Sequence, residues 1–158
     1  MARKRSTGRE RQHHGIPDLE PYLDCPADAA LGLDPLAVGW LHRNRPFPTG
    51  PVGDDFLAAL LPFCFEENLV CAVRVPRRCP LCNEIAPPVE REGRRTLPGA
   101  GEIRVLGKSD IYAAPDLIMH YITAHNYRPP HEFVQAVLLG PPAGAPEHRA
   151  LVRSLNAA

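Results

Sequence analysis

The sequence lacks several features that would point directly to a function. No stretch approaches the roughly 20 apolar residues that cross a bilayer, and no apolar segment follows the basic N-terminus as in a secretory signal. The 18 basic residues equal the 18 acidic residues in number, so net charge favours no class of partner. Gly-rich phosphate loops, nucleophile elbows and the His-Glu-x-x-His motif are also missing. These absences favour a cytoplasmic protein without a membrane segment, and they give no support to an enzyme.

The cysteines are few and odd in number. Two of the five form a Cys-x-x-Cys pair. This usage fits metal-bound thiolates in a reducing cytosol better than a framework of disulfides.

Length and charge distribution indicate one folded unit behind a polar tail. The 158 residues suffice for a single domain, and the 19 prolines favour short elements joined by ordered turns. Residues 1–15 carry five basic side chains against one acidic side chain and show no hydrophobic periodicity, so we expect a disordered basic tail. Residues 16–158 are expected to form a single zinc-binding α+β domain.

Periodicity and turn signals predict short elements in the first two thirds of this domain. They predict a helix over 36–41 anchored by Trp40, a helix capped by Asp54 that ends or kinks at Pro62, a strand over 69–75, and a long loop over 83–101.

The last third has clearer signals. They predict a β-hairpin of 102–106 and 111–113, a helix that starts at Pro115 and is capped by Asn126 in a left-handed conformation, a helix after Pro130 that ends at Gly140, and a short helix near 148–155.

Four residues carry the most specific chemistry, namely Cys79, Cys82, His120 and His125. Two soft thiolates on a tight turn and two imidazoles on a helix are the ligands of a tetrahedral zinc site. The histidines are five residues apart, which places them roughly 140° from each other on an ideal helix. The last helical turn must therefore loosen if both bind one ion.

The surroundings of these ligands suggest a structural metal. Four protein ligands leave no coordination position for water, whereas a catalytic zinc usually has three. Arg77 and Arg78 precede the turn, and we expect their charge to lower the thiol pKa values. His131 is the nearest substitute if His125 is not a ligand. Cys64 and Cys71 lie in apolar segments, where packing in the core is more common than a second metal site.

The chain resembles a family of small bacterial zinc-finger-like proteins of unknown function. The resemblance covers about residues 45–139 and rests on Cys79-Pro-Leu-Cys82, the Gly-Glu strand at 101–105, and the segment 112–133, in which a Tyr-Ala-Ala-Pro helix carries both histidines. One departure is the segment 74–78, which lacks the Arg-Gly-x-His sequence of the relatives. The resemblance implies a metal site and a bacterial cytosolic setting, and it implies no activity.

These features favour a structural-zinc protein that acts as a protein–protein interaction or adaptor module, with zinc as its cofactor and an unidentified protein as its partner. The alternative is nucleic-acid binding through the tail and the arginines Arg77, Arg78, Arg94 and Arg95. The helix with the two histidines contains no Lys or Arg, which disfavours base-specific DNA recognition. A zinc-dependent enzyme is a third and weaker hypothesis.

Overall fold

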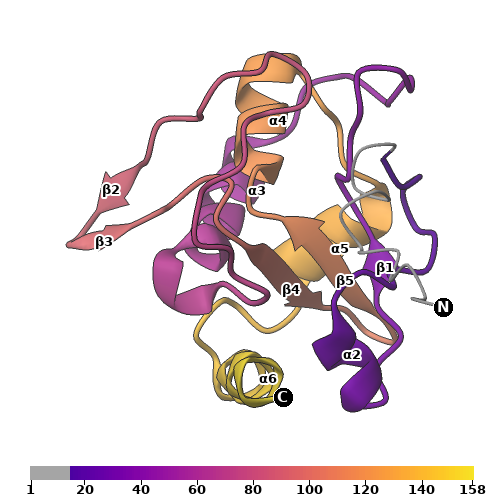
Figure 1. Ribbon diagram of the computed structural model, residues 1–158, viewed down its shortest axis with the longest axis vertical. Coiled ribbons are helices and arrows are strands. Elements are labelled where there is room, and N and C mark those ends of the chain that lie inside the picture. The colour runs from indigo at the N-terminus through magenta and orange to yellow at the C-terminus, as the bar shows by residue number, and fades with distance from the viewer. Residues whose placement is uncertain (1–14) are drawn as a thin grey trace, which may run out of the picture.

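The computed structural model describes residues 15–158, so the expected tail lies outside the described residues except for Gly15. Helices and strands are mixed along the chain, which confirms the α+β class (Figure 1). The helical elements are α2 (Pro26–Ala30), α3 (Asp54–Leu60), η1 (Leu61–Cys64), η2 (Glu66–Asn68), α4 (Ile118–His125), α5 (His131–Leu139) and α6 (Pro146–Ala157). The strands are β1 (Leu36–Ala37), β2 (Glu90–Arg91), β3 (Arg94–Arg95), β4 (Glu102–Leu106) and β5 (Ile111–Pro115).

The centre of the molecule is a small sheet with the strand order β1-β5-β4. β4 and β5 form the expected antiparallel hairpin, in which Ile103 lies opposite Ala114 and Val105 opposite Tyr112. The turn between them is closed by a 2.8 Å bond from the Gly107 amide to the Asp110 carbonyl. Gly-Lys-Ser-Asp between two apolar runs therefore predicted both strands and their connection correctly.

The expected helix over 36–41 is wrong. Leu36 and Ala37 form β1, which runs parallel to β5, and Gly39 takes a left-handed φ of 76° that ends any regular structure there. Trp40 is an anchor, as expected, because its indole N–H donates to the Ala113 carbonyl at 3.0 Å. Pairing with a strand far away in sequence has overridden the local helical spacing.

Helices α3 and α5 pack on each other and on the sheet to build the main core. Phe56 and Phe133 meet edge to face with ring centroids 6.2 Å apart, and Tyr112 contacts Phe133 in the same way at 5.9 Å. The N-cap of α3 is Gly53 instead of the expected Asp54. The α-helix ends at Leu60, beside Pro62 as expected, and the chain continues as the 3-10 helix η1.

The segment between α3 and β4 differs most from expectation. Only Val70 pairs with the sheet, through an isolated bridge to Glu102, so the strand over 69–75 is wrong. Cys71 instead takes a positive φ of 49° and forms a disulfide with Cys25, although the cysteine count had favoured free or metal-bound thiols. The expected loop over 83–101 contains the β2–β3 hairpin, which extends from the body of the molecule (Figure 1).

Helices α2 and η2 were not predicted, whereas α5 and α6 match the expected helices closely. α5 follows Pro130 and ends before Gly140, and α6 occupies the region expected to be helical near the end of the chain. Within 15–158, no helix combines the length and apolar character needed to cross a bilayer.

Candidate metal centre

The first pair of proposed ligands lies on a turn that its own backbone closes. The Asn83 amide donates to the Cys79 carbonyl at 2.8 Å, and the Cys79 amide donates to the Glu84 carbonyl at 2.9 Å. The Leu81 amide points at the Cys79 sulfur, 3.3 Å away. An amide aimed at the sulfur favours the thiolate, which is the form that binds a metal.

The second pair lies at the two ends of α4, which begins later than expected. Pro115 is the last residue of β5 and the helix starts at Ile118. Asp116 lies between them, and its carboxylate accepts bonds from the amides of Gly99 and Ala100 at 2.9 and 3.3 Å. This buried carboxylate ties the start of α4 to the chain that follows the cysteine turn.

Both histidines lie within the α-helix, which ends directly after His125, so the loosening expected of its last turn is confined to the cap. There the Tyr121 carbonyl accepts bonds from the amides of Asn126 and Tyr127, five and six positions on. Asn126 has the left-handed φ of 57° that was expected of the cap. The imidazole rings of His120 and His125 lie with their centroids 5.0 Å apart.

The structure brings all four sequence-predicted side chains together. One ligand atom from each of Cys79, Cys82, His120 and His125 lies within 4.8 Å of the others. Each sulfur is 3.5 Å from one histidine Nε2, Cys79 from His125 and Cys82 from His120. A tetrahedral zinc with Zn–S of about 2.3 Å and Zn–N of about 2.0–2.1 Å sets its sulfur and nitrogen ligands about 3.6 Å apart. The donor set and its spacing therefore fit one metal ion.

Burial, and not the preceding arginines, sets the direction in which the pKa of the Cys79 thiol is shifted. Cys79 is fully buried, and burial raises the pKa of its thiol, so the expected lowering by Arg77 and Arg78 is wrong for this residue. Arg78 instead donates to the Asn83 carbonyl at 3.2 Å and so braces the turn. Burial and the neighbouring His125 lower the pKa of His120, which favours the neutral imidazole that binds metals.

Other candidates from the sequence lie elsewhere. His131 is the exposed first residue of α5 and is not part of the group, so it is no substitute for His125. Cys64 is buried in the main core, as expected. Tyr112, Tyr121 and Tyr127 are at most 5% exposed and pack in the same core.

Sequence reasoning missed a second group that can hold a metal, formed by Cys25, Cys71 and Glu102. These residues are spread over three segments with no motif spacing. The only signal in the sequence was the presence of three cysteines outside the Cys-x-x-Cys pair. The sequence does not show which of these three lie close together. The group lies beside a cavity of about 440 Å³ whose lining also includes Cys79 and Asp116.

Comparison with known proteins gives a family and no function. A family model described as "Domain of unknown function (DUF7919)" matches residues 14–138, which is most of the chain. No curated protein and no solved structure matches the chain. The chain belongs to this family of domains of unknown function.

Proposed function

Because the family to which this chain belongs has no assigned function, we propose one from the site itself: a structural-zinc protein that acts as a protein–protein interaction or adaptor module. The observation that carries the proposal is the convergence of Cys79, Cys82, His120 and His125 within 4.8 Å. Two thiolates and two imidazoles are the donor set of zinc-finger-like sites, and four protein ligands close the coordination sphere. This arrangement supports a structural and not a catalytic role.

A structural metal is useful at this place because the chain around the turn has little support of its own. Residues 71–89 contain no regular helix or strand. Zinc would attach this segment to α4, which is itself packed on the core through Ile118 and Tyr121. The site would thus hold an irregular segment in one conformation.

The same segment exposes aliphatic side chains. Val75, Ile85 and Val89 are 78%, 56% and 41% exposed, and all three flank the cysteine turn in sequence. Exposed aliphatic side chains on an ordered segment favour contact with another protein. These residues are the proposed contacts of the partner.

The zinc site is tested first by elemental analysis. We expect about one zinc per chain to be lost when Cys79→Ser and Cys82→Ser are combined. His131→Ala is the matched control, because it removes a nearby exposed histidine that lies outside the group. Equal zinc contents in the double variant and the control would contradict the proposed site.

The proposed interaction role is tested by asking whether binding of a partner protein depends on the exposed aliphatic residues. Affinity capture from the native cell with chemical cross-linking should give a protein cross-linked near residues 75–89. Val75→Ser combined with Ile85→Ser should abolish its recovery, and Leu139→Ser, at a side chain 79% exposed on α5, should not. A partner retained by the double variant, or lost equally with the control, would overturn this assignment.

Nucleic-acid binding is the second candidate, and the ion pairs of the β2–β3 hairpin weaken it. Arg94 pairs with Glu67, and Arg95 pairs with Glu66 at 3.3 Å. Each carboxylate offsets a charge that the phosphate backbone would otherwise attract. Salt-dependent binding of mixed nucleic acid that is lost in Arg94→Ser/Arg95→Ser would nevertheless favour this second candidate.

A further inference from the structure

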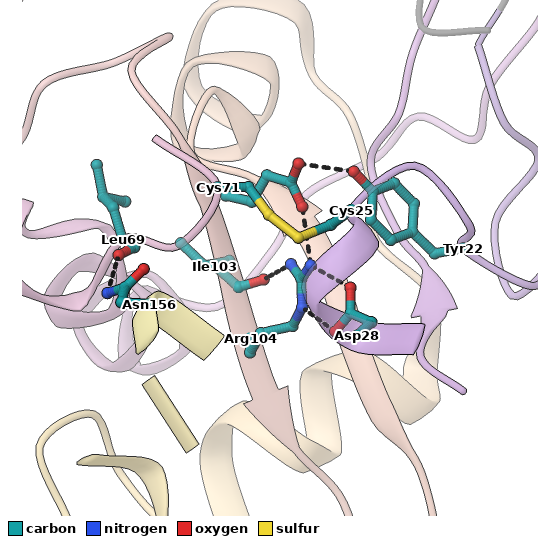
Figure 2. Close-up of a disulfide and its surroundings, with 9 residues drawn as sticks. Tyr22, Cys25, Asp28, Leu69, Cys71, Ile103, Arg104 and Asn156 are labelled. Atoms are coloured by element: carbon teal, nitrogen blue, oxygen red, sulfur yellow. Dashed lines mark hydrogen bonds and ion pairs between the residues drawn. A yellow bond between two sulfur atoms is a disulfide. The ribbon is translucent and has the colours of Figure 1, made fainter. Parts of the chain in front are cut away.

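Cys25 and Cys71 are held beside a third metal-binding side chain by the surrounding backbone. The amide and carbonyl of Val70 both bond to Glu102 at 2.9 Å, which places Cys71 next to the start of β4. Cys25 is the N-cap residue of α2. The two sulfur atoms are joined as a disulfide beside Tyr22 and Arg104 (Figure 2). They and a carboxylate oxygen of Glu102 lie within 4.8 Å of one another.

The Glu102 carboxylate is held in place by two hydrogen bonds. Its Oε2 accepts from the Tyr22 hydroxyl at 2.7 Å, and its Oε1 accepts from Arg104 Nη2 at 2.9 Å. Each carboxylate oxygen has two acceptor sites, so one remains on each atom. Hydrogen bonds of this kind fix a ligand and tune its affinity for a metal.

A buried arginine fixes the position of Glu102. Arg104 is fully buried and binds Asp28 through two bonds of 3.2 and 2.7 Å as well as Glu102. One guanidinium thus holds two carboxylates, and Glu102 is kept in place beside the sulfur atoms of Cys25 and Cys71.

The group also borders an open space. Cys71 and Glu102 line the cavity of about 440 Å³, together with Trp40 and Tyr121. A metal with three protein ligands at this wall would have its fourth position directed to the cavity, where a water molecule or an added ligand can bind. The Cys79–His125 site, with four ligands, has no such position.

We propose that Cys25, Cys71 and Glu102 form a second, redox-controlled zinc site that is closed by the Cys25–Cys71 disulfide and opened by its reduction. Two equivalents of a thiol reductant cleave the S–S bond, giving two cysteine thiols and the disulfide of the reductant. One zinc ion then replaces both thiol protons, which leave to solvent, and Glu102 supplies the third ligand. Two thiolates balance the charge of the ion, so the net charge beside Arg104 is unchanged by the exchange.

The test counts zinc in the oxidised and reduced full-length protein. Both forms are saturated with zinc, desalted and analysed for metal, and the disulfide state is verified by mass spectrometry after alkylation. Reduced protein is expected to hold one zinc more than oxidised protein. This difference does not depend on the Cys79–His125 site, whose failure would lower both counts equally.

Variants assign the extra zinc to these residues. Cys71→Ala should remove the redox-dependent difference, whereas Cys64→Ala should keep it, because Cys64 belongs to neither group. Tyr22→Phe should weaken the redox-dependent zinc by about 10-fold or more, as loss of an outer hydrogen bond does at metal sites. Equal zinc counts in reduced wild type and reduced Cys71→Ala would overturn the proposal.

A second readout does not depend on the variants folding. In reduced wild type under native conditions, zinc should protect Cys25 and Cys71 from alkylation, and cobalt should give added thiolate-to-metal absorbance that the oxidised protein lacks. Unprotected Cys25 and Cys71 at saturating zinc would equally overturn the proposal.

Discussion

Single residues matter most in this molecule where charge is buried, and Asp116 is one such place. Burial raises the pKa of Asp116 to about 7, although the amides of Gly99 and Ala100 bond to the carboxylate and oppose the shift. The folded protein therefore holds this proton more tightly than the unfolded chain. The stabilisation that protonated Asp116 contributes to the fold is fully present below the unfolded carboxyl pKa of about 3.9. It is lost as pH rises through about 7, the pKa in the folded protein.

Asp116→Asn should remove this dependence. The free energy of unfolding of wild type, relative to the variant, should fall by about 1–3 kcal/mol between pH 5 and pH 8. Urea unfolding at both pH values measures it, with Asp110→Asn, at the exposed hairpin turn, as the control. A relative stability that stays constant or rises with pH would contradict the prediction.

Arg104 is the second buried charge, and it has an exposed counterpart for comparison. Arg104→Met leaves the carboxylates of Asp28 and Glu102 buried without their cation, so we expect a loss of about 3–5 kcal/mol. Arg95→Met breaks a solvent-exposed pair with Glu66 and should cost less than about 1 kcal/mol. Urea unfolding of both variants checks the contrast, and equal losses would refute it.

At the scale of elements, sequence patterns succeeded where the signal was local. The β4–β5 hairpin, the Asn126 cap and α5 depend on residues within a few positions of each other, and they were predicted. The four side chains that could hold a metal ion were also found in the sequence, because Cys-x-x-Cys and paired histidines are short motifs. None of these needs knowledge of which distant segments meet.

Elements that depend on distant partners were missed. Leu36–Ala37 is a strand only because β5 lies beside it, and Cys71 forms a disulfide only because α2 brings Cys25 to it. The pairing of Arg104 with Asp28 spans 76 residues. Such contacts follow from the packing of the whole chain, and no local periodicity reports them.

Zinc removal should therefore act unevenly on the elements. Chelation should lower the melting temperature and raise hydrogen exchange first within residues 76–130, around the cysteine turn and the end of α4. The packed pair α3–α5, with Phe56 against Phe133, should stay protected because it has its own core. Hydrogen exchange with and without chelator measures this, and uniform loosening or no change would contradict the structural role of the metal.

At the scale of the whole molecule, a disulfide and the proposed zinc site each join distant parts of the chain. The disulfide joins the N-terminal segment to the region after η2, and the proposed zinc joins the cysteine turn to α4. Both border the same cavity, whose lining includes Cys71 and Cys79. The segment 71–79 is thus fixed at both ends, so each cross-link should influence the stability of the entire domain.

The disulfide should stabilise the domain chiefly through the unfolded chain. It closes a loop of 46 residues, for which the chain-entropy estimate is about 4 kcal/mol, with measured values more often about 2–4. In the presence of a chelator, reduction should lower the free energy of unfolding of wild type by this amount and leave Cys25→Ala/Cys71→Ala unaffected. Cys64→Ala starts from a lower stability because a buried side chain is truncated, yet it should keep the dependence on reductant. Urea unfolding with and without reductant gives these values.

If zinc added to the reduced wild type, but not to the reduced double variant, restores part of the lost stability, the metal has replaced the disulfide as the link between Cys25 and Cys71.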